Sequence, residues 1–457
     1  MSFSVSIDQL VSLLDATPVN FSEDIGQIEA TGICTDTRTL QPGEVFLAFR
    51  GSQFDGHKFV PIASQSGAIA AIVDRHYDQT HPKMPLLVVP DPLKAYQAIG
   101  HWWRQQFDIP VIGVTGSVGK TTTKELIAAV LGTQGQVLKT EKNYNNEIGV
   151  PKTLLGLTDE HDYAVIEMAM RGAGQIAELT EIARPTIGVI TNVGTAHIEL
   201  LGSVEAIASA KCELLAEMPP DGVAILNHDN QRLIDTAATV WQGPTLTYGL
   251  ESGELRGELR ENNILAVEGV ELPLPLTGRH NALNYLAALA VAKVLKIDWQ
   301  PLTEGVAVDL PSGRAKSYQL PNDILILDET YNAGLESMTA ALHLLMETSG
   351  KRHIAVLGTM KELGLRSLEF HQRVGAIAHQ LGVDALFIFA DIAEAEAMAI
   401  GAGDLPFIEI LDISRPNAHE SLAQRLSEFI VTGDRLLFKA SHSVQLNRVV
   451  ESLVGCS

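Results

Sequence analysis

Residues Val111–Thr123 read VIGVTGSVGKTTT, an apolar run that passes into a glycine-rich turn and then into a lysine and three threonines. This order is typical of a strand, a phosphate-binding loop and a helix, because N–H groups in such a turn converge on an anion at the positive end of the helix. Lys120 stands where it can reach the outer phosphates of a nucleotide, and Thr121 where its hydroxyl can hold Mg2+. Val114 replaces the first glycine of the usual G-x-x-x-x-G-K-[ST] pattern, so an ordinary glycine turn stays open as the alternative.

The composition is that of a globular protein with more than one domain. The chain has 457 residues, a formal net charge of −22, 46% hydrophobic residues and 19% charged residues. This charge argues against nucleic acid or an anionic membrane as the main partner, but it allows anionic substrates in local basic pockets. The three cysteines, Cys34, Cys212 and Cys456, are scattered and odd in number, which indicates a reducing compartment. No secretory start and no membrane-spanning run stands out, so we expect a cytoplasmic protein.

Changes of pattern along the chain predict three domains and an α/β fold class. Residues 1–90 mix short helices with strand-like runs bounded by Gly and Pro, which predicts a small α/β domain. Residues 91–312 alternate apolar runs with helical stretches around the phosphate loop, which predicts a central, mainly parallel sheet. In the stretch 246–276 apolar and polar residues alternate, so we expect antiparallel strands appended to that sheet. In residues 313–457 the alternation of apolar runs and helical stretches begins again, which predicts a doubly wound domain.

The predicted elements can be stated by residue range. The predicted strands are Val45–Phe49, Ala68–Val73, Leu86–Val89, Tyr163–Ile166, Ile187–Val193, Val223–Leu226, Ile324–Leu327, His353–Leu357, Ala385–Ala390, Phe407–Leu411 and Leu436–Phe438. The most readable helices of the third domain are Leu335–Thr348 and Leu368–Leu381.

Polar residues end two of the predicted strands, where open parallel sheets collect their ligands. Glu167 could bind Mg2+ beside Thr121, the alternative being a solvated acid. His197 follows the next strand with Asn192 and Thr195, and an imidazole there could bind a second metal or contact phosphate. Taken alone, His197 would more often be structural.

Lys211 lies on the apolar face of a predicted helix. The apolar residues at helical spacing on this face are Ile207, Leu214, Leu215 and Met218. One interpretation is a lysine that snorkels to the helix edge. The other is a desolvated amine of lowered pKa, able to react with CO2 and become a carbamate that binds metal.

Further candidates lie in the second half of the chain. Asn281 and Asn284 open an apolar helix, where they could cap the helix or hydrogen-bond a base. Arg314 lies in a turn, and Asp328 ends a strand that Tyr331 and Asn332 follow. Groups from one domain that cover a nucleotide held by another would suit a closure that excludes water.

Together these segments resemble the Mur ligase family over nearly the whole chain, and most closely its members that add D-alanyl-D-alanine to the peptidoglycan precursor. The resemblance rests on the order and spacing of GVTGSVGKTTTKE, KNYNNEIGVPKTLL, IEMAMRGAGQIAEL, ITNVGTAHIELLGSVEAIASAKCELL, GRHNALN and DETYNAGLESM, and on CTDTRTLQPGEVFLAFRG with FDGHKFV in the first domain.

The resemblance implies roles for the matching residues. The residues implied to bind ATP are Gly116, Ser117, Gly119, Lys120, Thr121, Thr122, Asn281 at adenine, Arg314 at the phosphates and Asp328 at the ribose. The implied metal ligands are Thr121, Glu167, His197 and Lys211 as its carbamate, and the implied catalytic residues are Lys120, Lys211, His197 and Glu167. The implied substrate contacts are Thr35, Asp36 and Arg38 at the uridine diphosphate, and Asn145, Asn146, Tyr331 and Asn332.

The implied reaction is peptide-bond formation driven by ATP and Mg2+. UDP-N-acetylmuramoyl-tripeptide would be activated as an acyl phosphate and captured by D-alanyl-D-alanine. The three domains would bind the UDP substrate, bind ATP, and bind the dipeptide while closing over ATP, in a monomer. Two alternatives are an amide ligase of the same architecture with another acceptor, and a nucleotide-gated binding protein without turnover.

The departures from the family pattern fall in the third domain. Thr359 stands where the family often has aspartate, and Ala440 and His442 stand where it commonly has glycine and arginine. In addition, NAGL replaces the frequent NANP after Tyr331. These departures bear on the dipeptide more than on ATP.

Overall fold

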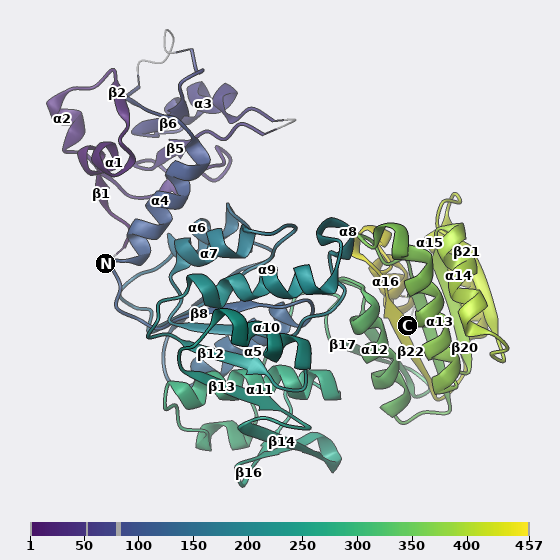
Figure 1. Cartoon of the computed structure of the whole chain (residues 1–457). Helices are drawn as coiled ribbons and strands as arrows, with labels where there is room; N and C mark the ends of the chain where they lie inside the picture. Colours follow the sequence, from purple (N-terminus) through teal and green to yellow (C-terminus); the bar gives the residue numbers. More distant parts are fainter. Residues whose placement is uncertain (1, 52–53, 79–83, 456–457) are drawn as a thin grey trace.

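The computed structural model describes residues 2–51, 54–78 and 84–455, so Cys456 lies outside the described residues. Its larger sheets have five, nine and six strands in the described part of the chain, and each sheet is built from one uninterrupted stretch of sequence (Figure 1). This is the predicted α/β class, with parallel sheets in all three parts. The sheets occupy residues 17–89, 111–273 and 316–439, and we keep the predicted domain limits as a proposal.

The N-terminal sheet has the strand order β2-β7-β6-β5-β4, with the pairs among β4 to β7 parallel and β2 antiparallel to β7. The elements of this domain are β1 (Val5–Ser6), α1 (Ile7–Leu14), β2 (Thr17–Val19), α2 (Glu23–Gly26), β3 (Glu29–Ala30), β4 (Ile33–Cys34), β5 (Val45–Leu47), η1 (Gly56–Phe59), α3 (Val60–Gln65), β6 (Ala70–Asp74) and β7 (Leu86–Val89). Strands β1 and β3 form a separate antiparallel pair. The predicted strand Leu86–Val89 is confirmed at both ends, because Pro90 ends the apolar run.

Helix α4 (Pro92–Arg104) leads from the first sheet to the second. Asp91 caps it by accepting from the N–H of Leu93 at 2.8 Å, and proline is well suited to the first helical turn. Trp103 is buried near its end and donates from Nε1 to the carbonyl of Leu157 at 3.1 Å. The helix is therefore anchored to the central domain.

The central sheet has the order β16-β15-β14-β13-β12-β11-β8-β10-β9. Its elements are β8 (Val111–Thr115), α5 (Lys120–Leu131), β9 (Val137–Lys139), α6 (Gly149–Leu154), β10 (Tyr163–Glu167), α7 (Gln175–Ala183), β11 (Ile187–Ile190), α8 (Ile198–Leu201), α9 (Val204–Glu217), β12 (Val223–Asn227), α10 (Gln231–Val240), β13 (Thr245–Gly249), β14 (Leu255–Arg260), η2 (Glu261–Asn263), β15 (Ile264–Val267), β16 (Val270–Pro273), α11 (Arg279–Val294) and η3 (Gln300–Glu304). Helices α5 and α11 share one apolar core, and α7 and α9 share another with the opposite face.

Two sequence predictions for this sheet need correction. Within the stretch expected to be antiparallel, the β14–β15 and β15–β16 pairs are antiparallel, but β13 pairs in parallel with both β12 and β14. The strand expected to run to Val193 ends at Ile190. The N–H of Thr191 still donates to the carbonyl of Thr115 at the end of β8, but the side chains of Thr191 and Asn192 bond to Val118 of the phosphate loop, and the chain leaves the sheet there.

The C-terminal sheet has the order β17-β18-β22-β19-β20-β21, parallel except for the β17–β18 pair. Its elements are β17 (Lys316–Leu320), β18 (Ile324–Glu329), α12 (Leu335–Glu347), β19 (Arg352–Gly358), η4 (Gly364–Arg366), α13 (Ser367–Leu381), β20 (Ala385–Ala390), α14 (Ile392–Ala402), β21 (Ile408–Asp412), α15 (Ala418–Phe429), β22 (Asp434–Lys439), η5 (His442–Val444) and α16 (Asn447–Gly455). The five predicted strands and two helices of this domain are confirmed within about two residues. Among the described residues, no helix is long and apolar enough to cross a membrane.

Candidate active site

A cleft of about 750 Å³ lies where the central and C-terminal domains meet. The central domain contributes the phosphate loop at 117–122, the polar segment 142–147 and the ends of strands β10 and β11. The C-terminal domain contributes residues 313–315, most of 329–341, residues 361–363, and Lys439 with residues 441–443. The cleft brings together 13 of the predicted site residues: Ser117, Gly119, Lys120, Thr121, Thr122, Asn145, Asn146, Glu167, His197, Asn281, Arg314, Tyr331 and Asn332.

Two glycines allow the phosphate loop to adopt its shape. Gly116 has φ 150°, and a Cβ there would lie 1.9 Å from Oγ1 of Thr191. Gly119 has φ 83°, and a Cβ there would lie 2.6 Å from Oδ1 of Asn284. Both positions therefore require glycine, for backbone conformation and for space.

The first amides of the loop are held by Asn192. The N–H of Ser117 donates to its carbonyl, and the N–H of Val118 donates to its Oδ1, each at 3.0 Å. These two amides are engaged in this conformation, so an anion must be met by groups that follow them. Asn192 is a strand-end residue noted in the sequence, and its function here is to shape the loop.

Lys120 opens helix α5, and its Nζ donates to the carbonyl of Gly116 at 2.9 Å. Burial lowers the pKa of Lys120, and the positive charge of Arg314 lowers it further, whereas Glu167 opposes the shift. The lysine therefore faces a carboxylate of its own domain and a guanidinium of the other domain. Thr121 and Thr122, which follow it, are buried and line the cleft.

Glu167 ends strand β10 with a side chain that is 2% exposed. Its Oε1 accepts from Nδ2 of Asn145 at 2.7 Å, and its backbone N–H donates to Oγ1 of Thr140 at 2.9 Å. Its Oε2 is buried and has no hydrogen-bond partner in the described part of the chain. A buried, unpartnered carboxylate oxygen in a polar cleft with the Thr121 hydroxyl fits a Mg2+ ion.

The support of Glu167 extends to a second buried lysine, which sequence reasoning missed. Lys124 donates from Nζ to the carbonyl of Thr140 at 2.6 Å and lies 2.7 Å from Oε1 of Glu125. Lys139 lies 2.5 Å from Oε2 of Glu125. This charged cluster fixes Thr140, and Thr140 in turn fixes the backbone of Glu167.

His197 caps helix α8 in the left-handed region, with φ 66°. Burial and the charge of Lys120 lower the pKa of its imidazole. Oε2 of Glu362, from the C-terminal domain, lies 2.7 Å from its Nδ1, although the contact lacks hydrogen-bond geometry. His197 therefore lies at the seam between the two domains.

Lys211 is 1% exposed on helix α9, so the interpretation of a lysine snorkelling to the surface is wrong. Burial lowers its pKa well below the ordinary value, and the charge of Lys120 adds to the effect. It is not among the residues that line the cleft. In the described part of the chain no group of three or more His, Cys, Asp or Glu side chains could hold a metal. A metal site here would therefore need Thr121 or a modified Lys211 beside Glu167 and His197.

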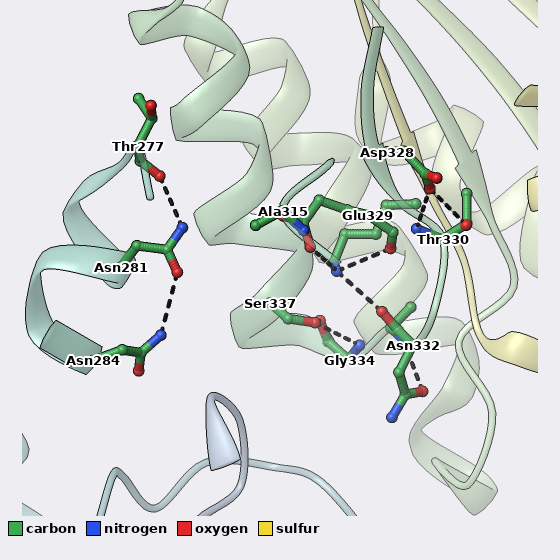
Figure 2. Close-up of polar contacts among 12 residues, drawn as sticks. Thr277, Asn281, Asn284, Ala315, Asp328, Glu329, Thr330, Asn332, Gly334 and Ser337 are labelled. Atoms are coloured by element: carbon green, nitrogen blue, oxygen red, sulfur yellow. Dashed lines mark hydrogen bonds and ion pairs between the residues drawn. The ribbon is translucent and has the colours of Figure 1, made fainter. Parts of the chain in front are cut away.

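The asparagines of helix α11 do not cap it, since Gly278 is the N-cap residue and makes no side-chain bond. Asn281 donates from Nδ2 to the carbonyl of Thr277 at 2.8 Å and accepts from Asn284 at 3.3 Å, as Figure 2 shows. Oδ1 of Asn284 accepts from Thr123 at 3.2 Å, which ties this helix to α5. Both asparagines line the cleft, and Asn284 also packs against the phosphate loop at Gly119.

On the C-terminal side, the guanidinium of Arg314 lies 3.9 Å from the ring centroid of Tyr331. The Tyr331 ring in turn lies 5.4 Å from that of His442. Nε of Arg314 is buried without a hydrogen-bond partner among the described residues. This places an unsatisfied cation at the cleft, opposite Lys120.

Glu329 and Lys439 hold this corner together, and neither was predicted. Oε1 of Glu329 accepts from the N–H of Ala315 at 3.1 Å (Figure 2). Lys439 lies 3.8 Å from Oε2 of Glu329 and donates to the carbonyl of Asn332 at 3.0 Å. Burial lowers the pKa of Lys439, while Glu329 opposes the shift. The pair fixes the loops that carry Arg314 and Tyr331.

Asp328 is 3% exposed and lies behind the residues that line the cleft. Its Oδ1 accepts from both the N–H and the hydroxyl of Thr330, at 3.1 and 2.6 Å (Figure 2). Burial raises its pKa.

The three residues predicted to face the uridine diphosphate lie in the N-terminal domain, apart from this cleft. Asp36 accepts from Arg38, with Oδ2 to Nη2 at 2.6 Å, and the bond to Arg38 lowers the pKa of Asp36 to about 2. Thr35 precedes this pair after strand β4.

Of the departures from the family pattern, His442 and the NAGL segment line the cleft, the latter through Ala333 and Gly334. Thr359 is buried, and its Oγ1 accepts from the N–H of Asp391 at 3.1 Å. Ala440 is fully buried, with its Cβ 2.7 Å from where a Cβ of Gly358 would lie. Thr359 and Ala440 are therefore packing substitutions, whereas His442 places an imidazole at the site.

Family models and related proteins match all three domains of the chain. The family models that match are "Mur ligase family, catalytic domain" over residues 29–96, "Mur ligase middle domain" over 114–292 and "Mur ligase, glutamate ligase domain" over 313–442. A Synechocystis protein named UDP-N-acetylmuramoyl-tripeptide–D-alanyl-D-alanine ligase is 56% identical over 95% of this chain and 94% of its own length. The Escherichia coli protein of that name is 36% identical over 88% and 89%.

Solved structures agree with these matches. The crystal structure of MurF from Acinetobacter baumannii has a TM-score of 0.87 and 29% identity, and covers 99% of both chains. The MurF ligase from Thermotoga maritima in complex with ADP has a TM-score of 0.81 and 30% identity, and covers 93% of this chain and 97% of its own. Because the similarity spans the full length in sequence and in fold, the chain belongs to the Mur ligase family.

Proposed function

We propose that this chain is an ATP-dependent, ADP-forming ligase that joins D-alanyl-D-alanine to UDP-N-acetylmuramoyl-tripeptide in peptidoglycan precursor synthesis. The observation that carries the proposal is the 56% identity over 95% of the chain to a Synechocystis protein with that activity in its name. The two-domain cleft, with a phosphate loop on one side and Arg314 on the other, supplies the chemistry that such a reaction needs.

The reaction has two steps, phosphoryl transfer and amide formation. The terminal carboxylate of the tripeptide attacks the γ-phosphorus of ATP, a P–O bond forms, and the bond to the bridging oxygen breaks to release ADP. The amine of the dipeptide then attacks the acyl phosphate, and inorganic phosphate leaves as the amide forms and a proton is lost. Because two anions meet in the first step, positive charge must converge on the transferred phosphoryl group.

Lys120 and Arg314 supply that charge from opposite walls of the cleft. Nζ of Lys120 now bonds to the carbonyl of Gly116, and phosphate oxygens of the nucleotide would replace this acceptor. Arg314 brings a buried Nε that has no partner among the described residues. We propose that Gly116, Ser117, Gly119, Thr121 and Thr122 shape the phosphate site, that Asn281 contacts adenine, and that Asp328 contacts the ribose.

Mg2+ is held, in this proposal, by Thr121 and Glu167, with His197 and carbamylated Lys211 at a second ion. When bound, Mg2+ neutralises phosphate charge and polarises the transferred group. Lys211 suits carbamate formation because burial lowers its pKa and a neutral amine is the form that adds to CO2, losing one proton. The chain's own contribution is to orient Glu167 through Asn145 and Thr140.

The substrates bind along a path from the N-terminal domain to the cleft. We propose that Thr35, Asp36 and Arg38 contact the uridine diphosphate, that Asn145 and Asn146 lie beside the peptide, and that Tyr331 and Asn332 face the dipeptide. Since ATP and nucleotide-linked precursors are cytoplasmic metabolites, we propose that the enzyme acts in the cytoplasm, as a monomer.

The proposal is tested by phosphate release with ATP, D-alanyl-D-alanine and UDP-N-acetylmuramoyl-tripeptide carrying diaminopimelate or lysine at its third position. We expect release that needs all three reactants, and a product heavier by one dipeptide residue unit in mass spectrometry. Free D-alanine and D-glutamate serve as control acceptors. Turnover with a control acceptor but not with the dipeptide would contradict the assignment of the acceptor.

A further inference from the structure

Glu336 crosses the cleft from the C-terminal domain to the central domain. It lies in the first turn of helix α12, where a negative side chain is favoured by the helix dipole. Its Oε1 accepts from the N–H of Thr195 at 2.7 Å, and its Oε2 accepts from the Thr195 hydroxyl at 3.0 Å. Both carboxylate oxygens are therefore committed to one residue of the other domain, and bonds to an ionised acceptor are the stronger kind.

The contact is close as well as polar. A Cβ at Gly194 would lie 2.6 Å from Cδ of Glu336, so the backbone beside Thr195 is packed directly against the carboxylate. Glu362 approaches His197 at 2.7 Å, and a Cβ at Gly364 would lie 2.9 Å from Cγ of Glu199. The C-terminal domain thus grips residues 194–199, which we call the seam loop, at several points.

The seam loop continues directly into the support of the phosphate loop. The N–H of Gly194 donates to Oγ of Ser117 at 2.8 Å. Asn192, two residues earlier, accepts from the amides of Ser117 and Val118 at 3.0 Å, and Thr191 donates from Oγ1 to the carbonyl of Val118 at 2.6 Å. Hydrogen bonds, joined through the backbone of Gly194 and Thr195, therefore connect Glu336 to the phosphate loop.

We propose that Glu336 is a positioning residue that couples docking of the C-terminal domain to the shape of the phosphate loop, and so to nucleotide affinity. The inference rests on the proposed function, because it takes the cleft to be the ATP site. Glu336 touches no substrate in this scheme. It acts through Thr195, Gly194 and Ser117, in addition to whatever Arg314 contributes by reaching the phosphates from the same domain.

Coupling is reciprocal for binding free energies, so a nucleotide that prefers the docked loop stabilises docking by the same factor. The physical requirement is an element with two arrangements that both sites bias. In the seam loop the two contacts fall on neighbouring residues, since Glu336 accepts from Thr195 and Ser117 accepts from Gly194, so a shift of one residue is passed to the other through a single peptide bond.

The test is a double-mutant cycle on ADP affinity, measured by calorimetry on the full-length protein. The variants are Glu336→Ala, Arg314→Ala and the double variant, with Glu347→Ala as the matched control. Glu347 lies on the same helix and is exposed. We expect the ADP dissociation constant to rise at least about fivefold on Glu336→Ala, in both the wild-type and the Arg314→Ala background. Glu347→Ala should leave it unchanged.

Comparison of the wild-type and Arg314→Ala backgrounds distinguishes two ways in which Glu336 could affect ADP affinity. If Glu336→Ala weakens ADP in the wild type but not beside Arg314→Ala, the residue only brings Arg314 into place and the coupling through the seam loop is overturned. An unchanged dissociation constant in both backgrounds overturns the inference outright. If the wild-type protein itself does not bind ADP, the proposed function fails first, and the inference fails with it.

A second variant guards against a folding artefact. Glu336→Gln keeps the size of the side chain and can keep both contacts, because its amide oxygen can accept from the N–H of Thr195 and its NH2 group can donate to the hydroxyl oxygen. It should therefore lower ADP affinity less than Glu336→Ala does. Thr195→Ser keeps both donors and should leave ADP affinity at the wild-type value. Equal thermal midpoints of all variants without ligand identify a binding effect. A Glu336→Gln variant that binds ADP more weakly than Glu336→Ala contradicts the inference.

Discussion

The residues around Glu167 show how one carboxylate can be given a single free oxygen. Asn145 takes Oε1, Thr140 takes the backbone N–H, and Oε2 is left buried without a partner among the described residues. An unsatisfied buried acceptor costs free energy comparable to a lost hydrogen bond. Such a cost is offset when a cation binds, which explains why this arrangement suits a metal ligand.

Thr140→Val tests whether the backbone bond positions Glu167. The substitution keeps the shape but removes the acceptor at Oγ1, so we expect about tenfold lower turnover and a higher Mg2+ requirement, in line with about 1–1.5 kcal/mol for one buried hydrogen bond. Steady-state rates over a Mg2+ series measure both. Thr140→Ser retains the hydroxyl and should behave as the wild type, and a Thr140→Val variant with unchanged Mg2+ dependence would refute the idea.

Lys211→Ala should remove most ligase activity while the protein still folds, because the variant lacks the amine that we propose is carbamylated. Short carboxylic acids such as acetate should restore part of the activity by occupying the vacated space, measured as ADP release with increasing acetate. Wild-type protein assayed with the same acids is the control. Full activity of Lys211→Ala without any added acid would rule out the carbamate.

Cys212 gives a pH dependence of stability with a defined sign. Burial raises the pKa of its thiol to about 12, against about 8.5 in an unfolded chain. Above about pH 8.5 the unfolded state therefore binds fewer protons than the native state, so stability is lost as pH rises, by about 2 kcal/mol at about pH 10. Urea unfolding should show a steeper decline for the wild type than for Cys212→Ala, and parallel declines would disprove it.

At the scale of elements, close crossings position the helices that surround the site. Helix α4 crosses α6 at Gly100, where a Cβ would lie 2.9 Å from both Cα and Cβ of Pro151. Helix α6 follows the segment that carries Asn145 and Asn146. The distance between these two helices therefore sets where that segment lies in the cleft.

Gly100→Ala should destabilise the protein by about 1–3 kcal/mol, because overpacking at the crossing outweighs the gain in helix propensity. Gly455→Ala is the matched control: this glycine also lies in a helix, and a Cβ there would meet nothing within 4 Å. The control should be neutral or slightly stabilising. Urea midpoints measure both, and a Gly100→Ala variant as stable as Gly455→Ala would contradict the crossing argument.

Elements bounded by strong local signals could be predicted from the sequence. Leu86–Val89 was confirmed at both ends because proline ends the apolar run. Ile187–Val193 was too long because Thr191 and Val193 favour strands, while the polar contacts of Thr191 lie 73 residues away in sequence, at Val118. The central half of the cleft could likewise be predicted, since its motif is contiguous. The roles of Glu329, Glu336 and Lys439 could not be predicted, because their partners come from other segments of the chain and no periodic sequence pattern distinguishes these residues.

At the scale of the whole molecule, the surfaces predicted for the two nucleotides are separate. Arg38 lies in the N-terminal domain, whereas the cleft lies between the other two domains. The uridine end and the adenosine end should therefore respond independently to substitution. Only the UDP-linked substrate has to reach from one surface to the other, so that its peptide carboxylate lies in the cleft.

Arg38→Ala should raise KM for the UDP-linked substrate about tenfold, by removing a charge-assisted contact, and should leave ADP affinity unchanged. Arg75→Ala, another exposed cation of the same domain, is the control and should change neither. Steady-state kinetics and calorimetry give the two values. A parallel loss of ADP affinity in Arg38→Ala would show that the two surfaces are not independent.

The position of β22 in the third sheet has a consequence for synthesis on the ribosome. This strand, Asp434–Lys439, is the last to be made, yet it lies between β18 and β19. A nascent or truncated chain that stops before it holds two partial sheets with open edges, and open edges recruit other chains or proteases. The first sheet also waits for its last strand, β7, which lies between β2 and β6, but β7 is made early, whereas the third sheet cannot close until translation is nearly complete. An unfinished copy therefore exposes strand edges through which it can be recognised and removed.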